Sequence, residues 1–129
     1  MTIQEELKKL ASPAKAKVLR SFFKTGPGQY GEGDVFIGVT IPKLRELAKR
    51  YSNASFVDLK SLLKSKVHEE RTLSLLILVD RYKKGDEKLQ KKIFDLYLRN
   101  TKWINNWDLV DASAPYIVGP YLQNRSKAV

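Results

Sequence analysis

The sequence predicts an all-α fold. Apolar residues recur every three or four positions through most of the 129-residue chain, which is the period of an amphipathic helix. Residues that favour helix N-termini stand before most of these stretches. No segment of alternating apolar and polar residues is long enough to form a competing β-strand. We therefore expect helices joined by turns, with one longer loop.

Two short helices are predicted at the N-terminus. Thr2 and Glu5 have the spacing of a capping box, which predicts that a helix begins here. Ser12 followed by Pro13 predicts the start of a second helix, because serine caps helices and proline fits their first turn. The apolar residues of this second helix are Val18, Leu19, Phe22 and Phe23. We expect the two helices to form a pair.

A glycine-rich loop is predicted over residues 25–39, which contain five glycines and one proline. Gly26, Gly28 and Gly31 have the spacing G-x-G-x-x-G, but they follow a predicted helix rather than a strand. The segment therefore lacks the structural context of a dinucleotide-binding fingerprint. The side chain of Tyr30 is either exposed on this loop or packed against the rest of the protein.

The middle of the chain predicts three more helices. Thr40, with Pro42 in the first turn, marks the start of one, and Ser55 with Asp58 marks the start of the next. A longer helix is predicted over residues 67–82, and it is apolar over much of its circumference. A helix of that kind belongs at the centre of a core.

Two further helices complete the prediction. Asp86 caps the sixth helix, and the seventh begins near Asn106. We expect Pro115, and then Gly119 with Pro120, to break the helical run after it, because proline lacks the amide hydrogen that a helix interior requires.

Successive helix pairs of about 35 to 40 residues, each too small to bury its own apolar face, are typical of an α-solenoid. We therefore predict a right-handed α-α superhelix of HEAT-like antiparallel helix pairs, forming a single domain over residues 1–129. Such arrays need a polar terminal cap, whereas this chain stops at Val129 just after a pair has begun. We expect it to be the N-terminal part of a longer array, truncated at its C-terminal end.

The composition favours a folded, basic protein. Hydrophobic residues make up 43% of the chain, enough for a core, which argues against disorder. Twenty-four Lys and Arg residues stand against 14 Asp and Glu residues, giving a net charge of +10. This excess favours polyanionic partners, although a solvated surface explains it equally well.

Composition also excludes several kinds of site. The chain has no cysteine, so it has neither a disulfide nor a thiolate ligand. His68 is its single histidine, and Thr72 stands where an H-E-x-x-H zinc helix needs its second histidine. The charged N-terminus has no uninterrupted apolar region of the kind a signal peptide needs, and the apolar run over residues 73–79 is far shorter than the roughly 20 residues that cross a bilayer. We expect a cytoplasmic protein that binds neither a metal nor a membrane.

The segment from Trp103 to Asp111 carries the strongest chemical signal. If its helix starts slightly before Asn106, then Trp103, Trp107 and Asp111 fall one turn apart on a single face. Two indole rings beside one carboxylate suit a cationic, planar ligand, because ring faces attract cations and the carboxylate stabilises positive charge. In the alternative interpretation both tryptophans are core residues and Asp111 is a buried, hydrogen-bonded helix residue.

Basic residues recur on the predicted helices. One group includes Lys43 and Arg45, and a second group lies between Lys83 and Lys92. Either group is able to follow a phosphate backbone, although solvated helix faces have the same pattern. Glu70 and Arg71 begin a helix, form ion pairs with neighbouring repeats or contact the polyanion.

Five short motifs occur in a characteristic order across most of the chain. They are Y-G-E-G-D at residues 30–34, F-I-G-V-T and P-K-L-R within residues 36–45, H-E-E-R at residues 68–71 and N-W-D-L-V-D at residues 106–111. Together these motifs resemble those of AlkD-like DNA alkylation repair proteins, which have HEAT-like repeats. The resemblance covers most of the sequence.

The resemblance implies a glycosylase that removes cationic N3- and N7-alkylpurines from duplex DNA without a metal or nucleotide cofactor. In that family the aspartate matching Asp111 is the catalytic carboxylate, and the tryptophan matching Trp107 contacts the lesion-bearing nucleotide. Such enzymes act on a base left in the stack, while a concave basic surface grips the backbone. We expect a monomer. The residues expected to contact DNA are Tyr30, Lys43, Arg45, Arg71 and Trp103.

The family also uses an arginine and a second tryptophan from later repeats. Arg125 follows Asp111 too closely to be that arginine, so we expect the isolated chain to be inactive. The alternative function is a non-catalytic HEAT-like module that binds DNA or serves as a protein-interaction scaffold. An Asp111 carboxylate open to a basic groove favours the enzyme, and one buried in hydrogen bonds between helices favours the scaffold.

Overall fold

The computed structural model describes residues 2–23, 35–100 and 107–127. Within these ranges, the side chains of residues 22–23, 107–112 and 124–127 are left undescribed. The described residues form helices, as the sequence predicts, and the only β-type pairing among them is an isolated bridge between Val35 and Val67. No helix in these ranges is long and apolar enough to cross a membrane.

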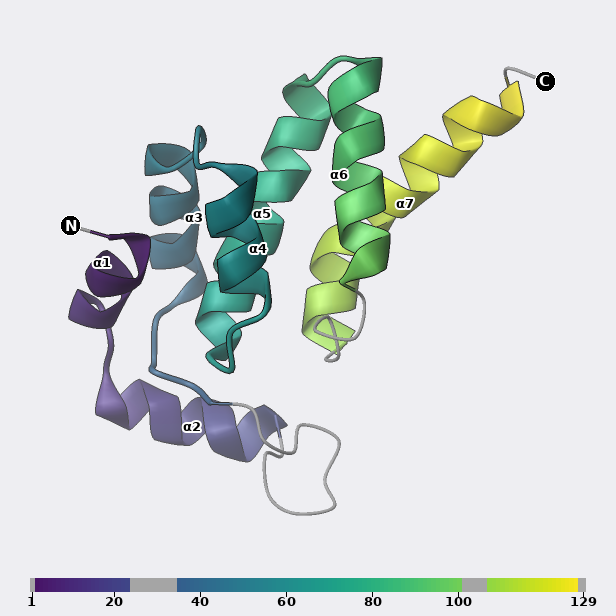
Figure 1. Ribbon diagram of the computed structural model, residues 1–129. Helices are drawn as coiled ribbons and strands as arrows, with labels where there is room; N and C mark the ends of the chain where they lie inside the picture. Colours follow the sequence, from purple (N-terminus) through teal and green to yellow (C-terminus); the bar gives the residue numbers. More distant parts are fainter. Residues whose placement is uncertain (1, 24–34, 101–106, 128–129) are drawn as a thin grey trace.

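Seven helices make up the described part of the chain (Figure 1). They are α1 (Ile3–Lys9), α2 (Pro13–Phe23), α3 (Ile41–Arg50), α4 (Phe56–Leu63), α5 (His68–Lys84), α6 (Glu87–Arg99) and α7 (Trp107–Lys127).

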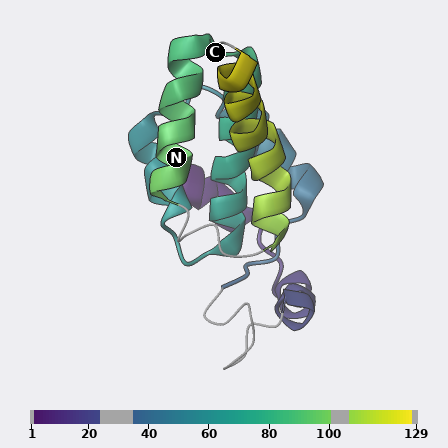
Figure 2. The same cartoon turned by 90° about the vertical axis from the view of Figure 1, so that its right-hand side faces the viewer.

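From α3 onwards, consecutive helices run in opposite directions. Helices α3, α5 and α7 therefore all begin at the same end of the array, the lower end in Figures 1 and 2. Helix α5 is the centre of this arrangement and packs against α3, α4, α6 and α7. The prediction that the fifth helix lies at the centre of the core is confirmed.

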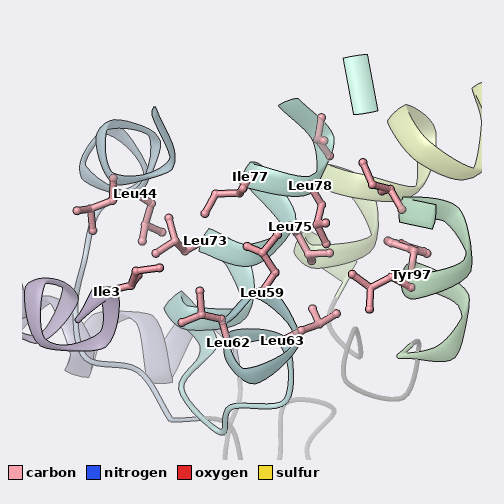
Figure 3. Packing of buried hydrophobic residues seen from close by; sticks show 14 of the residues in the cluster. Ile3, Leu44, Leu59, Leu62, Leu63, Leu73, Leu75, Ile77, Leu78 and Tyr97 are labelled. Carbon is pink, nitrogen blue, oxygen red and sulfur yellow. The ribbon is translucent and has the colours of Figure 1, made fainter. Parts of the chain in front are cut away.

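The core follows α5 along its length. Leu73, Leu75, Ile77 and Leu78 have at most 1% of their surfaces exposed, because neighbouring helices cover α5 on several sides. Figure 3 shows how side chains from α3, α4 and α6 meet those of α5. Residues of the cluster that Figure 3 labels on the other helices are Ile3, Leu44, Leu59, Leu62, Leu63 and Tyr97.

The predicted helix starts are confirmed with one difference in detail. Thr2 and Glu5 form a capping box, and the side chains of Ser55 and Asp86 accept hydrogen bonds from the amides of residues 58 and 89. Thr40 is the N-cap residue of α3, but its side chain makes no capping hydrogen bond. The start of α3 thus depends on backbone geometry and on Pro42 in its first turn.

Two expectations are wrong. First, α1 and α2 do not pack side by side as a pair, because α2 lies across the lower end of the array (Figure 1). Val18, assigned to the apolar face of this helix, is 68% exposed, whereas Ala16 is buried. The periodicity predicts a helix correctly, but it cannot specify which surface the helix packs against.

Second, Pro115 and Pro120 do not end the last helix, which continues to Lys127. Each proline removes one backbone hydrogen bond, which costs about 3 kcal/mol in a helix interior. Tertiary packing offsets this cost, because α7 packs against α5 and α6 and fully buries Ser113 and Ile117. Pro115 itself is exposed.

Candidate functional site

The start of α7 carries the two residues predicted to form the site. The helix begins at Trp107, so Trp107 and Asp111 lie one turn apart on one face of α7. The prediction of a helix starting near Asn106 is confirmed to this extent. The side chains of Trp107 and Asp111 are not among those described, and Trp103 and Asn106 lie outside the described residues.

The backbone of this part of α7 is unusual. Pro115 stands four residues after Asp111, so it supplies no N–H group to the Asp111 carbonyl. The helix consequently lacks one internal hydrogen bond next to the predicted catalytic residue. Contacts from neighbouring helices must therefore contribute more to holding these first turns in place.

One such contact joins α6 to α7. The hydroxyl groups of Tyr97 and Ser113 form a hydrogen bond of 2.9 Å. The two residues are 4% and 0% exposed. Burial raises the pKa of Tyr97 above its ordinary value of 10.0, while the bond from Ser113 acts in the opposite direction. Tyr97 is therefore protonated and able to donate at neutral pH.

The first turn of α5 anchors the segment before α3. The carboxylate of Glu69 accepts hydrogen bonds from the backbone amides of Ile37, Gly38 and Val39, and the Gly38 bond is the shortest at 2.8 Å. Glu69 is only 2% exposed. Its charge is therefore stabilised by amide donors in place of water, as a buried carboxylate requires.

Gly38 allows this segment to approach the start of α2. Its φ of +84° lies in the left-handed region that glycine adopts without strain. The amide of Ser12 donates to the carbonyls of Ile37 and Gly38. A Cβ atom on Gly38 would lie only 2.0 Å from the Ser12 carbonyl oxygen. Glu69 and Gly38 thereby hold residues 37–39, the last residues of the predicted glycine-rich loop, against α5 and α2. Tyr30 of this loop lies outside the described residues.

An apolar cavity of about 540 Å³ lies between α2, α3 and α5. Val18, Ile41 and Leu44 contribute to its walls, and so do Phe36 and His68. The rings of Phe36 and His68 stack with their centroids 4.5 Å apart. The buried His68 thus has a packing role. Among the residues that the structure describes, no group of three His, Cys, Asp or Glu residues is able to hold a metal ion.

Glu70 and Arg71 are also buried, with 8% and 3% of their surfaces exposed. Burial raises the pKa of Glu70, although a hydrogen bond from Ser65 and the charge of Lys8 on α1 act in the opposite direction. Arg71 was expected to form ion pairs or contact a polyanion, and the structure places it beneath the surface of the chain. The residues following His68 therefore lie mainly inside the array.

The basic residues of α3 are exposed, but they do not form one group. Lys43 and Arg45 are two positions apart, which places them on different sides of the helix. Lys43 lines a groove against α1 together with Arg50, whose guanidinium pairs with Glu6 at 3.0 Å. Arg45 shares its side of α3 with the exposed Lys49, one turn later. The two predicted contacts are thus separated on the surface of α3.

Several important residues gave no specific signal in the sequence. Glu69 was part of a motif, but its role as acceptor for three amides depends on a segment about 30 residues earlier. Tyr97 fitted the apolar side of a helix, and its bond to Ser113 depends on how α6 and α7 pack. Gly38 was one of five glycines in the predicted loop, and only its φ and its contacts distinguish it.

These features define an all-helical repeat protein, rich in positive charge, with a tryptophan and an aspartate one turn apart at the start of a helix. The sequence matches the family of DNA alkylation repair enzymes over residues 3–129, and the chain therefore belongs to this family. The resemblance to AlkD-like proteins and the helical repeat fold are thereby confirmed. Comparisons with curated proteins and with solved structures found no match.

Proposed function

We propose that this protein is a DNA glycosylase that hydrolyses the N-glycosidic bond of cationic N3- and N7-alkylated purines in duplex DNA. The proposal builds on membership of the DNA alkylation repair family. The observation that carries it is the spacing of Trp107 and Asp111, one turn apart at the beginning of α7. This spacing favours an aromatic ring and a carboxylate acting on the same ligand.

The chemistry of the substrate explains why a single carboxylate suffices. An N3- or N7-alkylated purine is already positively charged, so the electrons of the breaking bond to C1′ neutralise the departing base. Positive charge then develops on the deoxyribose, where the Asp111 carboxylate stabilises it. Water bonds to C1′ and loses its proton to the carboxylate or to solvent. No general acid is required, because the base leaves as a neutral molecule.

Charge supports DNA as the partner. The net charge of +10 attracts a phosphate backbone, and the N-terminal ends of α3, α5 and α7, each with a positive partial charge, lie at one end of the array. Arg45, with Lys49 one turn later, offers two exposed cations on one side of α3. Arg71 is not included among these contacts, because it is buried. Metal and nucleotide cofactors have no part in the proposed reaction.

The test is the Asp111→Asn variant, which keeps the side-chain volume and removes the charge. In the longer repeat array that the sequence predicts, we expect release of N7-methylguanine under single-turnover conditions to slow by about a hundredfold or more. This corresponds to the loss of about 2–4 kcal/mol that follows removal of one preorganised electrostatic group.

Measurements of DNA affinity and of melting temperature distinguish a catalytic role of Asp111 from a structural one. DNA affinity and melting temperature are expected to change little in Asp111→Asn, because neither depends on stabilising the transition state. Release that is unchanged in the variant contradicts a catalytic Asp111 and favours the alternative, a non-catalytic DNA-binding module or scaffold. Release that falls only in step with melting temperature assigns Asp111 a structural role.

A further inference from the structure

We propose that the hydrogen bond between Tyr97 and Ser113 positions Asp111 for the reaction, so that both are positioning residues of the glycosylase. This inference rests on the function proposed above. It concerns two residues that lie inside the helical array and do not themselves reach the substrate.

The bond is suited to fixing α7 against α6. Its two oxygen atoms lie 2.9 Å apart, and each belongs to a residue that is almost completely shielded from water. A buried hydroxyl that loses its partner has no water to replace it, so the pair favours one relative placement of the two helices. Figure 3 shows Tyr97 among the buried side chains of the core.

The position of Ser113 connects this bond to the site. Ser113 follows Asp111 by two residues on the same helix, which is about 3 Å along the helix axis. Over so short a distance the two positions move together. A rotation or shift of α7 that breaks the bond to Tyr97 therefore displaces Asp111 by a comparable amount.

Pro115 increases the importance of this bond. The first turns of α7 lack the hydrogen bond that residue 115 would otherwise donate to the Asp111 carbonyl. Beyond Pro115, α7 is held by the buried Ile117 and by the stacking of Tyr121 on Phe94, whose centroids are 4.0 Å apart. The Tyr97–Ser113 bond acts on the opposite side of Pro115, the side that carries Asp111.

A purely structural role makes a different prediction from a positioning role. Tyr97→Phe leaves the Ser113 hydroxyl without this partner, and Ser113→Ala does the same to Tyr97, so each change lowers stability. Combining them removes both hydroxyl groups, and stability is then expected to recover at least in part. A positioning role predicts that the rate of base release does not recover with it.

The first experiment monitors the start of α7 without any activity assay. The chain contains two tryptophans, Trp103 and Trp107, and Trp107 is the first residue of α7. The indole N–H signal of Trp107 in a two-dimensional NMR spectrum of the 129-residue chain therefore reports on the start of this helix. We expect Tyr97→Phe and the double variant to shift the Trp107 signal. Tyr51→Phe is the matched control, because the Tyr51 hydroxyl bonds to Glu6 on α1, which lies at the opposite end of the helix array from α7 in Figure 1.

The second experiment measures single-turnover release of N7-methylguanine by the longer repeat array that the sequence predicts. We expect Tyr97→Phe, and equally the double variant, to release the base about tenfold more slowly, since small displacements of a reacting group reduce rates strongly. The affinity for duplex DNA should stay unchanged. Tyr51→Phe should release the base at the original rate.

Different outcomes separate this inference from the function on which it rests. An unshifted Trp107 signal, an unchanged rate in Tyr97→Phe, or a rate that recovers with stability in the double variant overturns the positioning role. If Asp111→Asn releases the base as fast as the original protein, the proposed function fails instead. The NMR spectra then show whether the bond fixes the start of α7 regardless of catalysis.

Discussion

The carboxylate of Glu69 accepts a hydrogen bond of 2.8 Å from the backbone amide of Gly38, across about 30 residues of sequence. This bond joins the first turn of α5 to the segment that leads into α3. On its other side, the same segment receives the amide of Ser12 at the start of α2. Three parts of the chain therefore meet at this one point, close to the end of the array where α3, α5 and α7 begin.

Gly38→Ala is expected to be strongly destabilising. The added Cβ atom would lie 2.0 Å from the Ser12 carbonyl oxygen. In addition, the backbone at residue 38 has a φ of +84°. Both are unfavourable for alanine, and we expect a loss of about 2–4 kcal/mol in the free energy of unfolding. Urea denaturation measures this loss. Gly119→Ala is the matched control, because a Cβ atom there has open space within an exposed part of α7. It is expected to leave stability unchanged or to raise it by up to about 1 kcal/mol.

Glu69→Gln tests whether the backbone amides of residues 37–39 depend on a negative charge. The amide side chain keeps one acceptor oxygen, but its NH2 group faces donors, so we expect a loss of about 2–3 kcal/mol in stability. Amide hydrogen exchange should accelerate at residues 37–39 more than in the centre of α5. Glu46→Gln, an exposed glutamate on α3, serves as the control. Equal stability of the two variants would contradict the anchoring role of Glu69.

The buried side chain of Glu70 is expected to make the folded protein less stable as the pH rises. Because burial raises its pKa in the folded state above 4.5, folding favours the protonated carboxyl group. Stability from this group is complete below pH 4.5 and is lost as the pH rises through the raised pKa. The neighbouring charges are Lys8, which opposes the shift, and Glu69, which adds to it.

Glu70→Gln should therefore stabilise the protein at neutral pH, because the variant stays uncharged. The gain should shrink as the pH falls through the raised pKa, and it should be absent below pH 4.5, where the original side chain is protonated in both the folded and the unfolded state. Melting temperatures of both proteins between pH 4 and pH 8 measure this difference, with Glu46→Gln as the exposed control. A gain that is independent of pH would show that burial of the charge is not its cause.

Arg45 is expected to contribute to DNA binding through its charge. We expect Arg45→Gln to weaken binding to duplex DNA equally for different sequences, and to reduce the slope of log K against log salt by about one. Titrations of labelled duplex at several salt concentrations provide the slope. The control is Lys60→Gln, which removes an exposed charge on α4. Equal effects of the two variants would indicate that net charge alone drives binding, without a contact at α3.

The sequence alone determined the helical character of the chain and most of its helix starts. Capping residues such as Thr2, Ser55 and Asp86 act on amides three residues away, so their effect is contained in a short stretch of sequence. The sequence of α5 is apolar over much of the helix circumference, and this pattern correctly predicted that α5 lies at the centre of the core. The one-turn spacing of Trp107 and Asp111 required only that a helix begin near residue 106.

Tertiary structure decided the features that depend on segments distant in sequence. Local sequence rules predict that Pro115 and Pro120 end a helix, because proline lacks a backbone N–H group. Helix α7 nevertheless continues through both prolines, because its packing on α5 and α6 outweighs the two missing hydrogen bonds. Arg71 is a charged residue that was expected to contact a partner at the surface, yet only 3% of its surface is exposed in the folded chain. Glu69 meets Gly38, and Tyr97 meets Ser113, only after the helices have packed together. Local propensity acts over a few residues, whereas burial and hydrogen bonding between helices depend on the whole fold. The contacts between helices are therefore the ones that support the proposed site.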